Sequence, residues 1–462
     1  MKLISTLHEK LGDLWWYTIL LFIAQRMGDV INMFIGLWLV PKYVPQNELG
    51  AVLPLTQFVS LIGLPMGLVA IPFMKYLNIY ASRGELGKIK SLTRDVFAGT
   101  GILAVVTFAV AYFLLPILFT RMRVASGSLG ILIVGVSILS SISVIFQNAV
   151  QGLKLFSVTV WCNVVAAPFR LLLMCVFMPF RPLSGYFVGQ GAAPGTSIIG
   201  AFWALRKKLG KAVSAVPYWR EDGRGMIRYA VPIAINTILA VVVTSVEQLV
   251  IRHRLSDYES AGYYMISRFA DIASYMGSVF VVFLFPLVAG SKAKDRDSLK
   301  LLSHSMLGSM ASGIAVAVLL FFFGEMLMGL VSTWKAYQPL SGHMALLALV
   351  NVSIVVGSCL ITYETAQGRF GFLRYIVPIL TMKAVGLYAL TGYSYFYGIL
   401  PNSWLDAVAN FNPNRLGVLL WFFLAFNMVS DLCLVVDVFG RRINVAIRWR
   451  LRLSHLQGGR MP

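Results

Sequence analysis

Two Arg–Asp pairs lie inside long hydrophobic stretches of the chain. Arg26 and Asp29 stand in the run AQRMGDVINMF, and Arg268 and Asp271 stand in SRFADIAS. The three-residue spacing places both members of a pair on one face of a helix, where their charges partly neutralise each other. A charge at the centre of a bilayer raises the insertion free energy by about 2.5–3.5 kcal/mol, so such residues usually face protein or water. The pairs are therefore either structural ion pairs or sites where Arg binds an anion, such as phosphate, through two parallel hydrogen bonds.

Two more basic residues, Arg170 and Lys383, lie within other apolar stretches. Each alone is expected to extend its charged end towards a membrane interface. Together with Arg26 and Arg268, however, they make four cations inside hydrophobic segments, and a cationic cavity explains all four at once. We therefore take these four residues as candidates for binding an anionic substrate.

Carboxylates inside hydrophobic segments are candidates for a proton or cation site. Glu247 and Glu364 have no Lys or Arg one helical turn away in the sequence, so they are the freest to change protonation. For each, the alternative is a hydrogen bond to a neighbouring helix. The full set of candidate ion-coupling residues is Glu247, Glu364, Asp29 and Asp271.

Residues typical of soluble enzymes and metalloproteins do not form recognisable patterns. The sequence contains no GxxxxGK[ST] phosphate loop, and its five histidines have no metal-binding spacing. Asp431 and Asp437, near the expected end of the last apolar stretch, are interpreted as structural. The longest segment expected on the outer side, 397–412, is too short for a catalytic domain. We therefore predict no enzyme activity, catalytic residue, metal site or cofactor.

The composition predicts that lipid is the solvent for most of this chain. Of 462 residues, 58% are hydrophobic and 13% charged, and the mean hydropathy is +0.77. A soluble protein of this length could not bury that much apolar surface. The net charge of +20 comes from basic residues clustered between apolar stretches. This pattern is typical of cytoplasmic loops that face anionic lipid, and we predict no nucleic-acid partner.

Because a membrane-spanning helix needs about 20 mostly apolar residues, the sequence predicts about twelve spans. They lie near residues 14–40, 49–74, 95–118, 129–152, 156–179, 184–204, 228–251, 258–289, 303–330, 341–366, 371–396 and 413–438. The sixth, SGYFVGQGAAPGTSIIGAFWA, is the weakest of the twelve, because it is rich in glycine; a broken or partly re-entrant helix is the alternative to a full crossing. The predicted fold class is an all-α polytopic membrane protein with two six-helix lobes around a central cavity.

The Lys and Arg residues also predict an orientation. Of the 39, 27 fall in segments on the N-terminal side of the membrane and 8 on the opposite side, which places both termini in the cytoplasm. The predicted parts are an N-terminal lobe (1–205), a basic cytoplasmic linker (206–227), a C-terminal lobe (228–440) and a basic cytoplasmic tail (441–462).

Three stretches of the chain resemble one known family. They are VPQNELGAVLPLTQFVSLIGLP, RYAVPIAIN and EQLVIRHRLSDYESAGYYMISRFADI. They are similar to the polysaccharide transporter (O-antigen flippase-like) family of the multidrug/oligosaccharidyl-lipid/polysaccharide exporter superfamily. The resemblance implies two six-helix lobes that flip undecaprenyl-pyrophosphate-linked glycans by alternating access. It also implies that Arg26 and Arg268 are similar, by helix and approximate position, to arginines implicated in pyrophosphate binding in related flippases.

The function expected from the sequence is export of a lipid-linked oligosaccharide or polysaccharide precursor across the bacterial inner membrane. Its expected partners are the polyprenyl-pyrophosphate-linked glycan, the lipid bilayer and proteins of glycan assembly. One alternative is a cation-coupled drug antiporter of the same superfamily, which would favour an acidic, aromatic cavity. The other is a membrane glycan polymerase or ligase, which would carry a large outward loop with catalytic residues.

Overall fold

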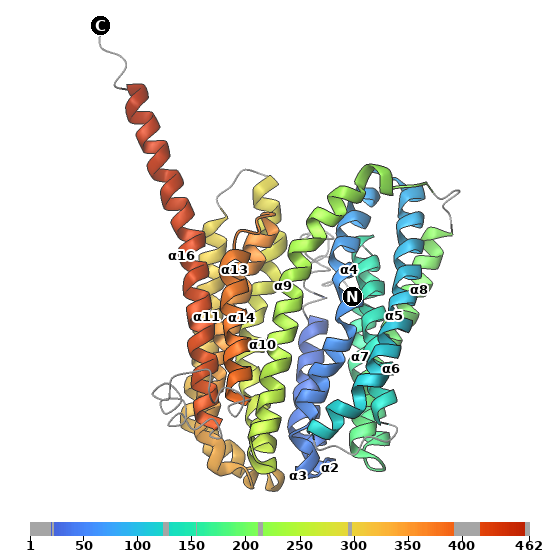
Figure 1. Ribbon diagram of the computed structural model, residues 1–462, viewed down its shortest axis with the longest axis vertical. Helices are drawn as coiled ribbons and strands as arrows, with labels where there is room; N and C mark the ends of the chain where they lie inside the picture. The colour runs from blue at the N-terminus through green and yellow to red at the C-terminus, as the bar shows by residue number, and fades with distance from the viewer. Residues whose placement is uncertain are drawn as a thin grey trace, which may run out of the picture. The chain divides into compact units, whose positions relative to one another are not determined.

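The computed structural model describes residue 20 and residues 23–122, 129–153, 155–210, 216–293, 298–391 and 416–457. These residues form helices joined by turns, and they contain no strand (Figure 1). The all-α prediction is therefore confirmed for the described chain. The segment 397–412, predicted to be the longest outward loop, lies outside the described residues.

A helix is present at each of the twelve predicted spans. Residues 23–34 are helical and continue through η1 (Ile35–Leu39) and α2 (Val40–Tyr43). The other long helices are α4 (Val52–Ser82), α5 (Leu86–Met122), α6 (Leu129–Gly152), α7 (Phe156–Phe177), α8 (Pro182–Leu209), α9 (Trp219–Arg254), α10 (Asp257–Ala293), α11 (Leu299–Gly329), α13 (Met344–Ala366), α14 (Leu373–Thr391) and α16 (Leu416–Gln457). The short elements are α3 (Gln46–Leu49), α12 (Ser332–Lys335) and η2 (Gln338–His343).

Within the described residues, eight of these helical segments are long and apolar enough to cross a membrane. They contain α4, α5, α6, α7, α9, α11, α13 and α16. A helix satisfies all its internal backbone groups without water, which is why apolar segments of this length fold as helices in lipid. That the segment from residue 23, α8, α10 and α14 also cross the membrane stays a prediction.

The chain packs as two compact units. Unit 1 comprises 1–265 and 387–392, and unit 2 comprises 266–386 and 393–462. The division falls inside α10, and α9 packs against α4 within unit 1. The lobes 1–205 and 228–440 stay a prediction about the arrangement in the membrane.

In unit 1, small residues let helices approach closely. α4 packs against α6, and the Ser141 hydroxyl donates a hydrogen bond to the Gly63 carbonyl oxygen at 3.2 Å. A Cβ atom at Gly152 would lie 2.9 Å from the Met74 carbonyl oxygen of α4. Close packing of this kind, with hydroxyl groups bonded across helices, is how helices associate in lipid.

For the sixth span the sequence left a continuous and a broken helix open, and the structure shows a continuous one. α8 runs without interruption from Pro182 to Leu209, although Pro194 lies inside it. At 28 residues it is roughly 42 Å long, enough to cross a bilayer. It packs along α7 and α6 (Figure 1), and a side chain at Gly189 would meet the Met174 side chain of α7. The glycines therefore serve helix packing.

The predicted linker 206–227 is partly helical. α8 continues to Leu209 with basic residues in its last turn, and α9 begins at Trp219 with Glu221 and Asp222 in its first turn. Basic side chains stabilise the C-terminal end of a helix, and acidic side chains stabilise its N-terminal end. Both acidic residues are also bonded to neighbouring helices. The Tyr80 hydroxyl of α4 donates a hydrogen bond to Asp222 at 2.8 Å, and Lys88 of α5 forms an ion pair with Glu221 at 2.6 Å.

Unit 2 is built around α13, which packs against α11 and α16. The Ser309 hydroxyl of α11 donates to the Gly277 carbonyl oxygen of α10 at 2.9 Å. A side chain at Gly313 of α11 would meet Val352 of α13. As in unit 1, small residues set the distance between helices.

Candidate functional site

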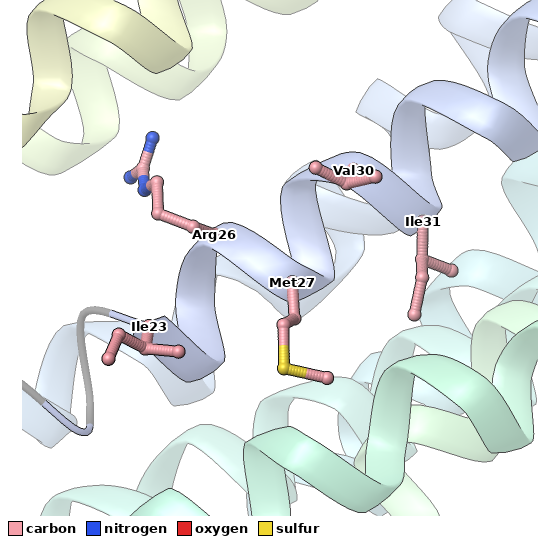
Figure 2. Close-up of a pocket in the computed structure, with 5 residues that line it drawn as sticks. All are labelled: Ile23, Arg26, Met27, Val30 and Ile31. Atoms are coloured by element: carbon pink, nitrogen blue, oxygen red, sulfur yellow. The ribbon is translucent and has the colours of Figure 1, made fainter.

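The first candidate pair lies on the helix that spans residues 23–34. The Arg26 guanidinium and the Asp29 carboxylate form an ion pair at 3.0 Å, and their side chains are 22% and 20% exposed. Arg26 lines a pocket of about 460 Å³ with the apolar side chains Ile23, Met27, Val30 and Ile31. Figure 2 shows that the Arg26 guanidinium extends away from Met27, so a cationic group stands at an otherwise apolar wall.

This helix is held against α7. The two helices are close at Gly28, where a Cβ atom would lie in ordinary van der Waals contact, 4.0 Å from the Ala167 Cβ. Three residues further along α7, Arg170 donates a hydrogen bond from Nη1 to the Asn32 side-chain oxygen at 2.8 Å. The structure thus gives Arg170, predicted as a substrate ligand, a second task, which is to fix the helix that carries Arg26.

The second candidate pair lies on α10 in unit 2. Arg268 and Asp271 form an ion pair at 3.1 Å, with side chains 24% and 28% exposed. Asn351 of α13 hydrogen-bonds to Asp271, which orients the pair towards α13. Beside it, the ring of Phe269 meets Trp334 edge to face, with 5.2 Å between ring centroids. The two pairs are therefore alike in spacing, distance and partial exposure, although they belong to different units.

Lys383 is placed differently from the two paired arginines. It is only 3% exposed, and its ammonium group donates to the Asn427 side-chain oxygen of α16 at 2.8 Å. The same ammonium group lies 5.4 Å from the centroid of the Phe423 ring. Lys383 thus joins α14 to α16, and a soluble ligand has little access to it.

The candidate carboxylates also differ from one another. Glu364 is 1% exposed near the end of α13, whereas Glu247 in α9 is half-buried. Next to Glu247, Gln248 is buried and donates to the Tyr263 hydroxyl at 3.4 Å. Of the four candidate ion-coupling residues, Asp29 and Glu247 lie in unit 1, and Asp271 and Glu364 lie in unit 2.

Two polar clusters escaped the sequence analysis. Arg252 is the largest fully buried side chain that the structure describes. Asp431 of α16, interpreted as structural, accepts a hydrogen bond from Ser353 of α13. Arg252 bonds to the Asn47 carbonyl oxygen, 205 positions away, and Asp431 to Ser353, 78 positions away, so the local sequence does not contain these contacts. No three His, Cys, Asp or Glu residues of the described chain are grouped to hold a metal ion.

No protein-family model and no curated protein sequence matches the chain. Solved structures do. The chain is similar to one titled the inward-facing conformation of a multidrug resistance MATE family transporter of the MOP superfamily, with 12% identity, a TM-score of 0.63, and 96% of this chain and 100% of that chain covered. A mutant of the Vibrio cholerae MATE transporter VcmN is 14% identical to this chain with a TM-score of 0.63, and the match covers 94% of this chain and 97% of that chain. The lipid II flippase MurJ in its inward closed conformation is 15% identical with a TM-score of 0.59, and the match covers 91% of this chain and 87% of that chain. At these identities the similarity establishes the fold alone, which is the fold of MOP superfamily membrane transporters.

Proposed function

We propose that this protein is a flippase that moves a lipid-linked oligosaccharide or polysaccharide precursor across the bacterial inner membrane by alternating access. The observation that carries the proposal is the pair of partly exposed arginines, Arg26 and Arg268, each neutralised by an aspartate on its own helix. The similarity of the fold to the lipid II flippase MurJ supports the proposal.

An arginine paired in this way suits a pyrophosphate ligand. The guanidinium group presents several N–H donors in a planar fork, and one carboxylate does not use them all. Asp29 and Asp271 lower the free-energy cost of placing the charge in an apolar segment, and each can be displaced partly when a phosphate binds. In this proposal Arg26 and Arg268 contact the anionic head group, Arg170 fixes the helix that carries Arg26, and Lys383 joins α14 to α16.

The main rival function is a cation-coupled drug antiporter, and the similarity to MATE transporters favours it. A drug antiporter would use its acidic residues to bind cationic compounds, and the arginines would be structural. The two functions therefore differ in which member of each pair contacts the substrate.

The deciding experiment uses purified protein in liposomes and measures flipping of a fluorescent polyprenyl-pyrophosphate sugar. We expect Arg26→Ala and Arg268→Ala each to abolish flipping while the protein still inserts and accumulates. Lysine at either position should restore only part of the activity, because it keeps the charge but loses the two-pronged hydrogen bonding. The exposed Arg181 provides the control, and Arg181→Ala should flip normally.

Two results would refute the proposal. One is full flipping activity in both alanine variants, which would leave the arginines as structural pairs. The other is a wild-type protein that does not flip the lipid-linked sugar but expels a cationic dye, which would identify the drug antiporter.

The orientation is tested separately. Reporter tags at the N-terminus, at residue 215 and at the C-terminus should all report the cytoplasm, given the 27-to-8 bias in Lys and Arg. An external signal from the tag at 215 would mean that an odd number of spans precedes it, and the arrangement of two six-helix lobes would fail.

A further inference from the structure

Asp431 occupies a fitted recess between α16 and α13 in unit 2. The Ser353 hydroxyl of α13 donates a hydrogen bond to Asp431 Oδ2 at 2.5 Å. One turn further along α13, a Cβ atom at position 357 would lie 2.7 Å from Asp431 Oδ1, so the space for the carboxylate exists because residue 357 is glycine. The carboxylate is thus held by one hydroxyl group and packed closely against the backbone of a neighbouring helix.

Three other aspartates in or beside the described spans each have a basic partner. Asp29 pairs with Arg26, Asp271 with Arg268, and Asp437, on the same helix as Asp431, with Arg374 at 2.6 Å. Asp431 forms no ion pair with a basic residue of the described chain. A carboxylate in an apolar segment without a countercharge is costly in its ionised form, and such residues commonly take part in proton relays.

The charged and titratable neighbours of Asp431 come from each element packed around it. From α14, Lys383 is bonded to Asn427, which lies one helical turn before Asp431 on α16. From α13, Cys359 lies within electrostatic range of Asp431. From α10, the pair Arg268–Asp271 reaches α13 through Asn351, two residues before Ser353.

We propose that Asp431 is a proton-binding site whose occupation drives transport, an inference that rests on the transport function proposed above. A proton from water binds Asp431, which removes its charge, and it leaves again to water when the carboxylate becomes exposed on the other side. Ser353 holds Oδ2, and the recess at Gly357 fixes the orientation of the carboxylate.

The surroundings favour a proton over a metal cation. A bound Na⁺ would need several oxygen ligands, and the described site offers one carboxylate and one hydroxyl group that already donates to it. The backbone carbonyl groups of α13 are engaged within the helix.

The first test does not require the substrate. Infrared difference spectra of the purified protein, recorded as the pH is changed, report the C=O stretch of a protonated carboxyl group. We expect a titrating band that Asp431→Asn removes and Asp431→Glu shifts. The matched control is Asp437→Asn on the same helix, because that carboxylate is held by Arg374 and should not contribute to the band. A band unchanged in Asp431→Asn would overturn the proposal.

If Asp431→Asn does not fold, Ser353→Ala keeps the carboxylate and provides the same test. A hydroxyl group that donates to the ionised form stabilises it, so its removal should move the midpoint of the band to higher pH. Ser358→Ala is the control, since the Ser358 hydroxyl donates to the Ile354 carbonyl oxygen of its own helix. Equal midpoints in the two serine variants would overturn the proposal.

The second test uses liposomes with the fluorescent polyprenyl-pyrophosphate sugar. A proton gradient should accelerate flipping by the wild type, and Asp431→Asn should lose this acceleration while retaining exchange without a gradient. Acceleration by a Na⁺ gradient alone would overturn the proposal. If the wild type titrates at Asp431 but flips no lipid-linked sugar, the proposed function fails and the proton site stands.

Discussion

Replacing Arg252 with methionine should destabilise unit 1 more than any other single substitution that we consider. Arg252 lies near the end of α9, and its side chain is 1% exposed. Nη1 of its guanidinium group donates to Asp257 Oδ1 at 2.9 Å and to the Ser260 hydroxyl oxygen at 3.0 Å. Nη2 donates to the Asn47 carbonyl oxygen at 2.8 Å. A single side chain thereby ties α9 to the start of α10 and to α3. Methionine keeps most of the buried volume but none of these bonds.

The magnitude follows from the three contacts. Asp257 is 43% exposed, so its charge attraction to Arg252 is screened and contributes about 1 kcal/mol or less. Hydrogen bonds from a charged donor to the Ser260 and Asn47 oxygens contribute about 1.5 kcal/mol each at the lower end of their range. The lower end applies because water can reach Asn47 once the arginine is gone. We therefore expect a loss on the order of 3 kcal/mol, or roughly a hundredfold in the folding equilibrium.

The assay is thermal unfolding of the purified protein in detergent, combined with hydrogen exchange of the peptides that cover the start of α10. Arg252→Met should lower the melting temperature by several degrees and speed exchange of the Ser260 amide, which is bonded to the Ser256 carbonyl oxygen. His253→Met is the matched control, because His253 is exposed and its replacement should change stability by less than about 0.5 kcal/mol. Equal melting temperatures for the two variants would refute the reasoning.

Four further substitutions test the packing and the coupling residues. Gly50→Ala should destabilise the folded protein by about 1–3 kcal/mol, because the added methyl group meets the buried Ser260 side chain. Gly67→Ala, where the methyl group enters open space, should be neutral or stabilising. Equal melting temperatures for the two variants would contradict this reasoning. Glu247→Gln or Glu364→Gln should slow flipping in liposomes and flatten its dependence on pH while substrate binding stays largely intact. Wild-type rates and pH profiles in both variants would make these two carboxylates structural.

The helices could be predicted because lipid imposes a strong constraint on each apolar segment separately. Every predicted span contains a helix, since a backbone in hydrocarbon must satisfy its polar groups within its own segment. The same constraint decides between the two alternatives at α8. Glycine lowers helix propensity by about 1 kcal/mol per residue, and that local preference is weaker than the requirement for a continuous helix.

The candidate site could be predicted only where both partners lie on one helix. The pair Arg26–Asp29 follows from its spacing, since residues three apart share a helix face. The bonds from Arg170 to Asn32 and from Arg252 to Asn47 join residues 138 and 205 positions apart, and no local pattern contains them. The Asp431 recess depends on a glycine of another helix, so it becomes visible only when α13 and α16 are packed together.

This difference between pairs within a helix and pairs between helices bears on the transport function proposed above. A charge paired across helices, such as Arg374 with Asp437, loses its partner when the helices separate, and an uncompensated charge in the membrane is costly. A charge paired within its own helix, such as Arg268 with Asp271, keeps its partner through any movement of that helix. Groups that must meet a substrate in more than one conformation should therefore be paired within their own helix. Groups that hold a helix in place should be paired across helices.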